Sequence, residues 1–203
     1  MKLSLFTGGF CETNGYLVET PEGNFIVDAP EGIAGWVAAR GVRVDAVLLT
    51  HQHFDHVMDA AALQAAGARL HALADYSTDL TLEEMVRQGG MEFAVPPYRI
   101  DQRLVVVAGG SWPFCGLKFA LYHIPGHAPD SVVFHLPELE LAFSGDTLFA
   151  GSIGRTDLPG GSHRLLLDGI ARDLLTLPPR TKLLPGHGPA TTIAEELATN
   201  PYL

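Results

Sequence analysis

The chain has 203 residues, 47% of them hydrophobic and 18% charged, and a formal net charge of -10. That length and composition suffice for a sizeable core, and the acidic balance disfavours a nucleic-acid partner because phosphate binding depends on clustered Lys and Arg. No apolar run approaches the ~20 residues of a membrane helix, and the first residues lack the apolar stretch of a signal peptide. We therefore expect a cytoplasmic protein without a membrane partner.

The first part of the chain alternates between strand and helix patterns. Short apolar runs separated by turns predict an antiparallel meander, and the strand-helix alternation that follows favours parallel pairing. The expected meander has strands at residues 3–6, 16–19 and 25–28 and turns at 13–15 and 21–24. The elements expected next are a helix at 32–40, a strand at 42–49, a helix at 60–66 and a strand at 69–72.

The stretch at residues 75–101 is less regular, although residues 82–88 fit a helix. Such a segment either lies over a site and contacts substrate or is a plain connecting loop. The elements expected after it are strands at 104–108, 117–124, 131–136, 139–143 and 182–184 and helices at 164–177 and 191–199. We find no repeat, low-complexity tract or linker, so we expect one domain over residues 1–203.

Four candidate metal ligands follow a short apolar run that ends at Leu49. They are His51, His53, Asp55 and His56. Imidazole and carboxylate ligands suit borderline divalent ions, zinc first, with iron and manganese as alternatives. Extended spacing sends residues at i and i+2 the same way, so His51 and His53 can share one ion while the other two side chains point elsewhere. The loop thus predicts ligands for two adjacent ions.

Three further candidate ligands end later apolar runs, each directly after a glycine that lets the backbone turn sharply. They are His127, Asp146 and His187. The seven ligands can be distributed as His51, His53 and His127 on one ion and Asp55, His56 and His187 on the other, with Asp146 bridging. Each ion then keeps an open position, the pattern of a catalytic site. Among these ligands, we expect Asp55 and Asp146 to be the catalytic carboxylates.

Other polar residues receive less specific interpretations. Asp28 ends a strand, where it can either cap the following loop or orient a ligating imidazole; the sequence favours the cap. The remaining histidines are assigned to packing or surface positions, and they are His71, His123, His135 and His163.

The motif HQHFDH at residues 51–56, followed by PGH at His127, GD at Asp146 and PGHG at His187, resembles the signature of the metallo-beta-lactamase superfamily. The resemblance, with the Asp28 strand as its first part, covers nearly the whole chain. It implies an α/β fold, a four-layer αββα sandwich with the metals at one edge between two sheets. Residues 145–149 and 154–161 resemble the short, single-domain glyoxalase II (hydroxyacylglutathione hydrolase) type, whose family reaction hydrolyses S-D-lactoylglutathione to D-lactate and glutathione.

We therefore expect a metal-dependent hydrolase with two divalent ions, which cleaves a small-molecule thioester by a metal-bridging hydroxide. A thiolate leaves without a strong general acid, and this favours thioesters or lactones over amides. Arg155 is the candidate clamp for a substrate carboxylate, or else an ion-pair partner of Asp157.

Four other functions stay open. A persulfide (sulfur) dioxygenase of the same superfamily needs one iron on a His, His, Asp set that matches His51, His127 and Asp146. A lactonase or another hydrolase of this fold would use the same ligands. The negative charge speaks against a nuclease, and the open coordination positions speak against a non-catalytic, metal-stabilised binding module.

Overall fold

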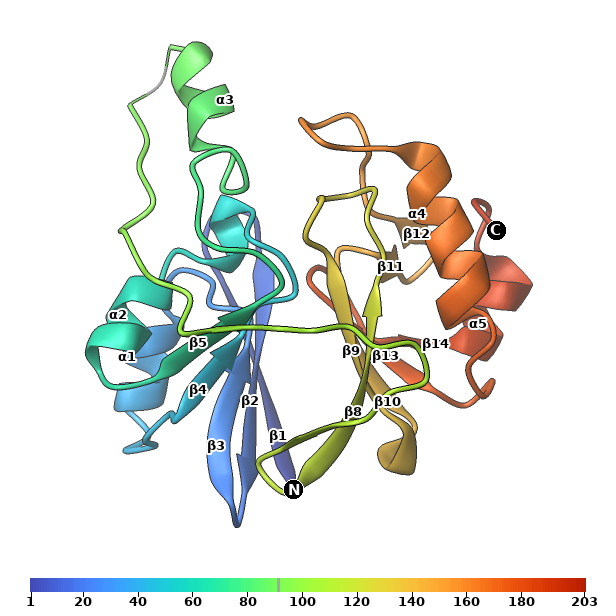
Figure 1. Cartoon of the computed structure of the whole chain (residues 1–203), viewed down its shortest axis with the longest axis horizontal. Coiled ribbons are helices and arrows are strands. Elements are labelled where there is room, and N and C mark those ends of the chain that lie inside the picture. Colours follow the sequence, from blue (N-terminus) through green and yellow to red (C-terminus); the bar gives the residue numbers. More distant parts are fainter. Residues whose placement is uncertain (91) are drawn as a thin grey trace. The chain divides into compact units, whose positions relative to one another are not determined.

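The computed structural model describes residues 1–90 and 92–203, so only Met91 of the irregular stretch lies outside the description. The chain divides into two units, Met1–Val105 and Val106–Leu203. Each unit holds a six-stranded sheet with short helices (Figure 1). The fold class is therefore α/β, as expected, while the single domain over residues 1–203 stays a prediction.

The sheet of the first unit joins an antiparallel meander to a parallel half. Its strands follow one another in space as in sequence: β1 (Lys2–Gly8), β2 (Thr13–Thr20), β3 (Gly23–Val27), β4 (Ala46–Leu48), β5 (Arg69–Ala72) and β6 (Gln102–Arg103). β1 to β3 pair antiparallel and β3 to β6 pair in parallel. Both expected pairing modes are confirmed, because α1 (Ile33–Ala38) and α2 (Ala60–Ala65) supply the crossovers that parallel neighbours require.

The parallel half is held by an apolar core under α1 and α2. Ile33 and Val37 lie one helical turn apart and pack with Leu63 of α2 against the sheet. Their buried strand partners include Leu17, Ile26, Val47 and Leu70. Burying an aliphatic side chain of this kind stabilises the fold by about 1.5–3 kcal/mol. This packing fixes the register of β3 and β4, at whose carboxyl ends the candidate ligands begin.

In the second unit the sheet order is β14-β13-β10-β9-β8-β7. The strands are β7 (Trp112–Phe114), β8 (Leu117–His123), β9 (Val132–Leu136), β10 (Leu141–Gly145), β13 (Lys182–Pro185) and β14 (Thr191–Thr192). β9 is antiparallel to both β8 and β10, and β10 is parallel to β13. Consequently β8, β10 and β13 run the same way and end at the same edge of this sheet.

Helices cover one face of the second sheet. α4 (His163–Gly169) continues into a π-helical turn (Ile170–Leu174), and α5 (Ile193–Thr199) follows β14. Leu166, Ile170 and Ile193 pack against Val133 and Leu183 of the strands. A small hairpin of β11 (Leu148–Phe149) and β12 (Ser152–Ile153) completes the unit. Across the described residues of both units, no helix is long and apolar enough to cross a membrane.

Several expected boundaries were wrong. The turn expected at 13–15 is the start of β2, because Asn14 pairs with Thr7 of β1 and accepts a hydrogen bond from its hydroxyl. The strand expected at 104–108 is absent; after Leu104 has donated its backbone N–H to Ala72, β5 has ended and offers no further partner. The helices expected at 164–177 and 191–199 are present with shifted ends, whereas α3 (Glu83–Gln88) lies within the predicted range.

Candidate metal centre

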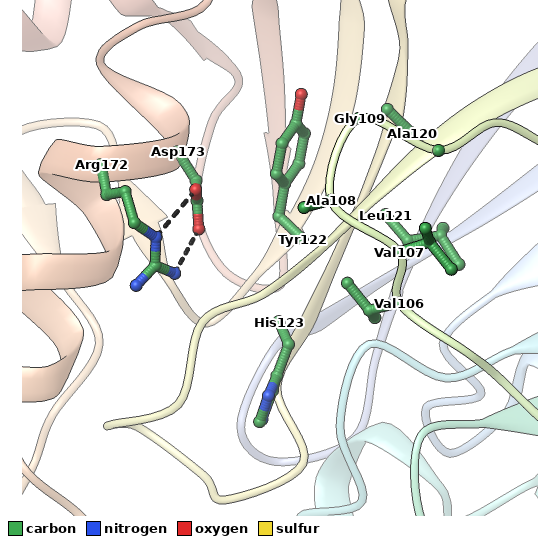
Figure 2. A pocket seen from close by; sticks show the side chains of 11 residues that line it. Val106, Val107, Ala108, Gly109, Ala120, Leu121, Tyr122, His123, Arg172 and Asp173 are labelled. Atoms are coloured by element: carbon green, nitrogen blue, oxygen red, sulfur yellow. Dashed lines mark hydrogen bonds and ion pairs between the residues drawn. The ribbon is translucent and has the colours of Figure 1, made fainter.

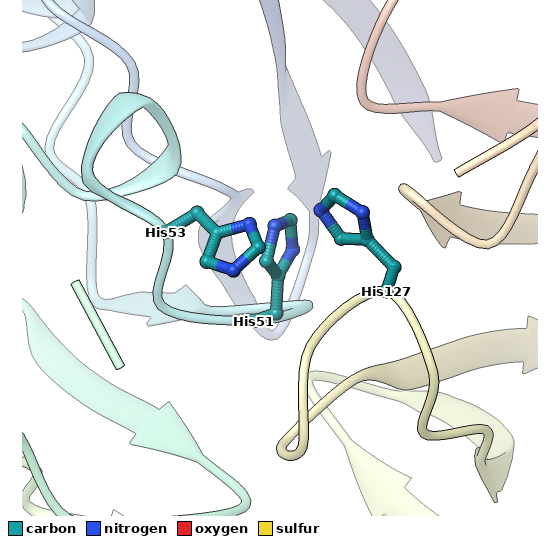
Figure 3. A group of neighbouring side chains, drawn as sticks. All are labelled: His51, His53 and His127. Carbon is teal, nitrogen blue, oxygen red and sulfur yellow. The ribbon is translucent and has the colours of Figure 1, made fainter. Parts of the chain in front are cut away.

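The candidate ligands of the first unit lie on the loop that follows β4. His51 and His53 leave it with their ring centroids 4.6 Å apart and their planes at 80°. His56 ends a short 3-10 turn (Phe54–His56), with its ring centroid 4.1 Å from that of His51. Figure 3 shows His51 and His53 on this loop, together with His127, which belongs to the second unit.

The buried Asp28 orients the imidazole of His56. Its Oδ2 lies 2.9 Å from Nδ1 of His56, and its Oδ1 accepts the backbone N–H of Thr50 at 2.8 Å. A carboxylate only accepts, so Nδ1 of His56 carries the proton, and in the neutral imidazole Nε2 presents its lone pair. The capping role favoured on sequence grounds is therefore wrong: the residue before α1 is Gly32, and Asp28 serves the ligand loop.

Thr50 extends the same orientation to His51. Its hydroxyl donates to Oδ2 of Asp28 at 2.8 Å and lies 3.2 Å from Nδ1 of His51. Because the only hydroxyl proton goes to Asp28, the oxygen accepts from Nδ1–H of His51, whose Nε2 is then the lone-pair nitrogen. Sequence reasoning assigned no role to Thr50. The signal available was a hydroxyl directly before the first ligand, at the end of a buried strand.

In the second unit, the three candidate ligands follow β8, β10 and β13, which end at one sheet edge. Oδ2 of Asp146 lies 3.4 Å from Nε2 of His127 and 3.4 Å from Nε2 of His187. Nδ1 of His127 donates to the backbone carbonyl of Arg155 at 2.9 Å, which leaves the lone pair of neutral His127 on Nε2. The structure thus brings together all three site residues predicted for this unit.

Gly154 allows this close arrangement. A Cβ atom on it would lie 1.9 Å from the carbonyl oxygen of Asp146 and 3.0 Å from Cβ of His127. Any side chain at this position would therefore displace the backbone of Asp146 or of residue 154 itself, beside two candidate ligands.

The spacing of these pairs is that of ligands on a common ion. Two atoms about 2.0–2.2 Å from one ion at a tetrahedral angle are about 3.4 Å apart, whereas N–H···O hydrogen bonds span about 2.7–3.2 Å. Asp146 meets both of its imidazoles at 3.4 Å, and Oδ2 of Asp55 lies 3.5 Å from Nε2 of His56. For His56 and His127 the facing atoms are both acceptors in the tautomers fixed above. A divalent metal ion can accept a lone pair from both members of such a pair, so each unit's donor set fits one.

Arg155 takes the alternative role considered for it. Its Nε and one terminal nitrogen donate to the two carboxylate oxygens of Asp157, both at 2.7 Å. The guanidinium lowers the pKa of the exposed Asp157 carboxyl to about 2, mainly through these hydrogen bonds. A contact between Arg155 and substrate stays a prediction.

Outside the ligand set, His135 on β9 is buried. Within the described part of the chain neither of its ring nitrogens has a hydrogen-bond partner, and desolvation lowers its pKa. Figure 2 shows a pocket of the second unit of about 360 Å³, which contains the ion pair of Arg172 with Asp173. None of the predicted site residues lines that pocket.

The sequence pattern of the Metallo-beta-lactamase superfamily matches residues 8–187. The probable metallo-hydrolase YqgX of Bacillus subtilis is 33% identical, with 100% of this chain and 98% of YqgX covered. Hydroxyacylglutathione hydrolase GloC of Haemophilus influenzae is 33% identical, with 95% of this chain and 93% of GloC covered.

Solved structures agree with these relatives. The BLEG-1 B3 metallo-beta-lactamase has a TM-score of 0.87 at 31% identity and covers 100% of this chain and 99% of its own. TTHA1623 in a di-iron-bound form has a TM-score of 0.82 at 38% identity, with 98% and 100% covered. The α/β fold is therefore of the metallo-beta-lactamase type, as the sequence resemblance implied.

Proposed function

The chain belongs to the metallo-beta-lactamase superfamily, and from this premise we propose that it is a binuclear metal-dependent hydrolase that cleaves a thioester such as S-D-lactoylglutathione. The observation that carries the proposal is Oδ2 of Asp146, which lies 3.4 Å from an imidazole nitrogen on either side. One carboxylate oxygen at ligand spacing from two histidines is suited to bridge two ions.

We assign the ligands as the sequence predicts. His51, His53 and His127 would hold the first ion, Asp55, His56 and His187 would hold the second, and Asp146 would contribute to both. Within each unit, the fixed Nε2 lone pairs and the 3.4–3.5 Å carboxylate spacings support this division. Zinc is our first choice of metal, and the di-iron form of TTHA1623 supports iron as the alternative.

When bound, two divalent ions would supply hydroxide at neutral pH and polarise the substrate carbonyl. The chain's own residues prepare for this by holding protons away from the ligating atoms: Asp28 at Nδ1 of His56, and the Arg155 carbonyl at Nδ1 of His127. A thiolate leaving group, with a pKa of ~8.5, departs without a donated proton. Among the ligands, Asp55 and Asp146 are the carboxylates that we assign to catalysis.

The similarity to GloC, over nearly the whole of both chains, supports a glutathione thioester as the substrate. We place Arg155 as the group that binds a substrate carboxylate. The exchange would replace an exposed ion pair with Asp157, which solvent screens, so a substrate carboxylate can compete for the guanidinium.

Two alternatives remain within the same fold. A persulfide dioxygenase would need one iron on His51, His127 and Asp146. His56, which the buried Asp28 orients, would then have no ligand role. A lactonase or beta-lactam hydrolase would use both ions, and the name of BLEG-1 supports testing a beta-lactam.

The test combines metal analysis of the purified protein with turnover. We expect about two metal ions per chain and chelator-sensitive release of D-lactate and thiol from S-D-lactoylglutathione without oxygen uptake. His56→Ala and His187→Ala should each lower turnover more than about 100-fold. Loss of a residue that only orients a metal ligand costs up to about 100-fold, so a larger loss indicates a ligand. His163→Ala, at the exposed start of α4, is the matched control and should be unchanged.

Other substrates decide between the alternatives. Oxygen consumption with glutathione persulfide and no thioester cleavage would establish the dioxygenase. Faster turnover of a lactone or beta-lactam would replace the substrate class. Full activity after complete metal removal would overturn the proposal.

A further inference from the structure

Gln52 lies between two candidate ligands and takes no part in either proposed metal set. In an extended run its side chain points away from those of His51 and His53. It is fully buried. Its Nε2 donates to the carbonyl of Ala74 at 3.1 Å, and its Oε1 accepts the hydroxyl of Tyr98 at 2.9 Å. Through these two hydrogen bonds, Gln52 connects the ligand loop to the irregular stretch that follows β5.

That stretch, residues 74–90 and 92–98, is called the strap below. It is organised around Glu83, a buried carboxylate in the first turn of α3. Glu83 accepts hydrogen bonds from Tyr76 Oη at 3.0 Å, Thr81 Oγ at 2.6 Å and the backbone N–H of Val95 at 3.0 Å. These contacts join the chain before α3, the helix itself and the chain after it.

Two aromatic contacts link Glu83 and the strap to the ligand loop. The rings of Tyr76 and Tyr98 meet edge to face with centroids 4.9 Å apart, so the residue that donates to Glu83 packs on the residue that donates to Gln52. Phe93 of the strap meets Phe54, the residue before Asp55, with centroids 5.1 Å apart and planes at 73°. Such pairs contribute about 0.5–1.5 kcal/mol beyond burial.

We propose that the strap sets the geometry of the metal ligands, with Tyr98 and Glu83 as positioning residues. The ligand loop has no regular structure between β4 and the 3-10 turn, so its backbone depends on contacts from other segments. Gln52 supplies one such contact between His51 and His53, and Phe54 supplies another beside Asp55. Because imidazole and carboxylate ligands must be placed to within about 0.5 Å, a shift of Gln52 is transmitted directly to its neighbours.

The proposal rests on the metal site of the proposed function, but it makes a separate statement: residues that touch no metal govern its affinity. The sequence left open whether this stretch lies over a site and contacts substrate or is a plain connecting loop. A connecting loop would contribute to stability alone. A positioning segment changes metal affinity and coordination geometry by more than its effect on stability explains.

The test measures Co²⁺ binding, because its visible absorption reports coordination geometry and needs no turnover. The variants are Tyr98→Phe, which removes one hydroxyl and keeps the ring, and Glu83→Gln, which keeps the shape and turns part of an acceptor into a donor. We expect each to weaken Co²⁺ binding about ten-fold, measured by competition with a chelating dye, and to alter the absorption bands. Tyr76→Phe, which removes the hydroxyl between Glu83 and the Tyr98 ring, should have the same effect on Co²⁺ affinity and absorption.

Two controls separate positioning from loss of stability. Val37→Ala removes apolar contacts of α1 in the same core that Tyr98 joins, but leaves the hydrogen bonds of Gln52, Tyr98 and Glu83 in place. It should lower Tm by about 5 °C with Co²⁺ affinity and spectrum unchanged. Tyr122→Phe makes the same chemical change as Tyr98→Phe, but on β8 of the second unit. It should change neither the Co²⁺ affinity nor the absorption spectrum.

The outcomes are distinct for the two proposals. Wild-type affinity and spectrum in Tyr98→Phe and Glu83→Gln, or equal losses in Val37→Ala, would overturn the positioning role and leave the hydrolase proposal intact. A wild-type chain that binds no Co²⁺ would overturn both. Weaker binding with shifted bands in the strap variants alone would support the inference, even if thioester turnover were absent.

Discussion

Asp28→Asn is the most informative single substitution, because it changes one buried atom and leaves every candidate ligand in place. The carboxylate accepts three hydrogen bonds: Oδ1 from Thr50 N, and Oδ2 from Thr50 Oγ and His56 Nδ1. An amide offers one acceptor oxygen and one donor nitrogen, so it cannot satisfy this pattern in either orientation.

The two amide orientations have different costs. With its oxygen toward Thr50 N, the NH₂ group meets Nδ1 of His56, which must then accept; the imidazole proton moves to Nε2, the atom that faces Asp55. With the amide reversed, the NH₂ group meets the Thr50 N–H inside the fold, at a cost of about 1–3 kcal/mol. We therefore expect metal affinity to fall 10–100-fold, about 1.4–2.7 kcal/mol, or the apo-protein to lose comparable stability.

The assay is competitive titration of zinc or Co²⁺ together with urea denaturation of the chelator-treated protein. Asp59→Asn is the matched control three residues beyond His56. Its Oδ2 alone accepts the N–H groups of Gly32 and Ala34, and an amide oxygen can do the same. That variant should keep its metal affinity and lose less than about 1 kcal/mol. Wild-type affinity and stability in Asp28→Asn would refute the tautomer argument.

Three other substitutions have defined outcomes. Burial lowers the pKa of His135 in the folded state, so its effect on stability should be absent above the unfolded pKa of ~6.5, and stability should fall as the pH drops toward the folded pKa. In urea denaturation of the chelator-treated protein between pH 7.5 and 5, His135→Leu should reduce this loss of stability. An unchanged slope of stability against pH would contradict the prediction. Glu196→Ala removes the acceptor of Gly151 N, Thr191 Oγ and Asn200 Nδ2 and should cost roughly 2–4 kcal/mol, visible as a large fall in Tm. Arg155→Ala should raise KM for a glutathione thioester with little change in kcat and less than about 0.5 kcal/mol in stability, because its ion pair is exposed; an unchanged KM would exclude it from binding substrate.

Much of the fold could be predicted because local pattern and tertiary contact agree. Ile33 and Val37 give α1 a helical period, and Gly41, with φ 65°, ends the segment where only glycine is unstrained. The secondary-structure prediction was wrong where the presence or absence of a neighbouring strand determined the structure. Asn14 reads as a turn residue but pairs with Thr7, and the alternating residues after Leu104 have no strand beside them.

The candidate site divides in the same way. Ligand identities follow from chemistry and spacing, and His127, Asp146 and His187 follow the ends of strands that run the same way. The residues that orient the ligands were harder to predict. On sequence grounds Asp28 is more typical of a cap, and the partner of Gln52, Tyr98, lies 46 residues away on an irregular segment. Such contacts depend on tertiary structure, so the local periodicity of the sequence does not predict them.

The proposed function requires that ligands from the two units hold the same ions. The measurement that tests it most directly is metal stoichiometry in His53→Ala of the first unit and His127→Ala of the second, beside the wild type. The wild type should hold about two ions per chain, and each variant, as well as the double variant, should hold about one, because both histidines serve one ion. Two ions retained in either single variant, or none left in the double variant, would contradict the shared assignment.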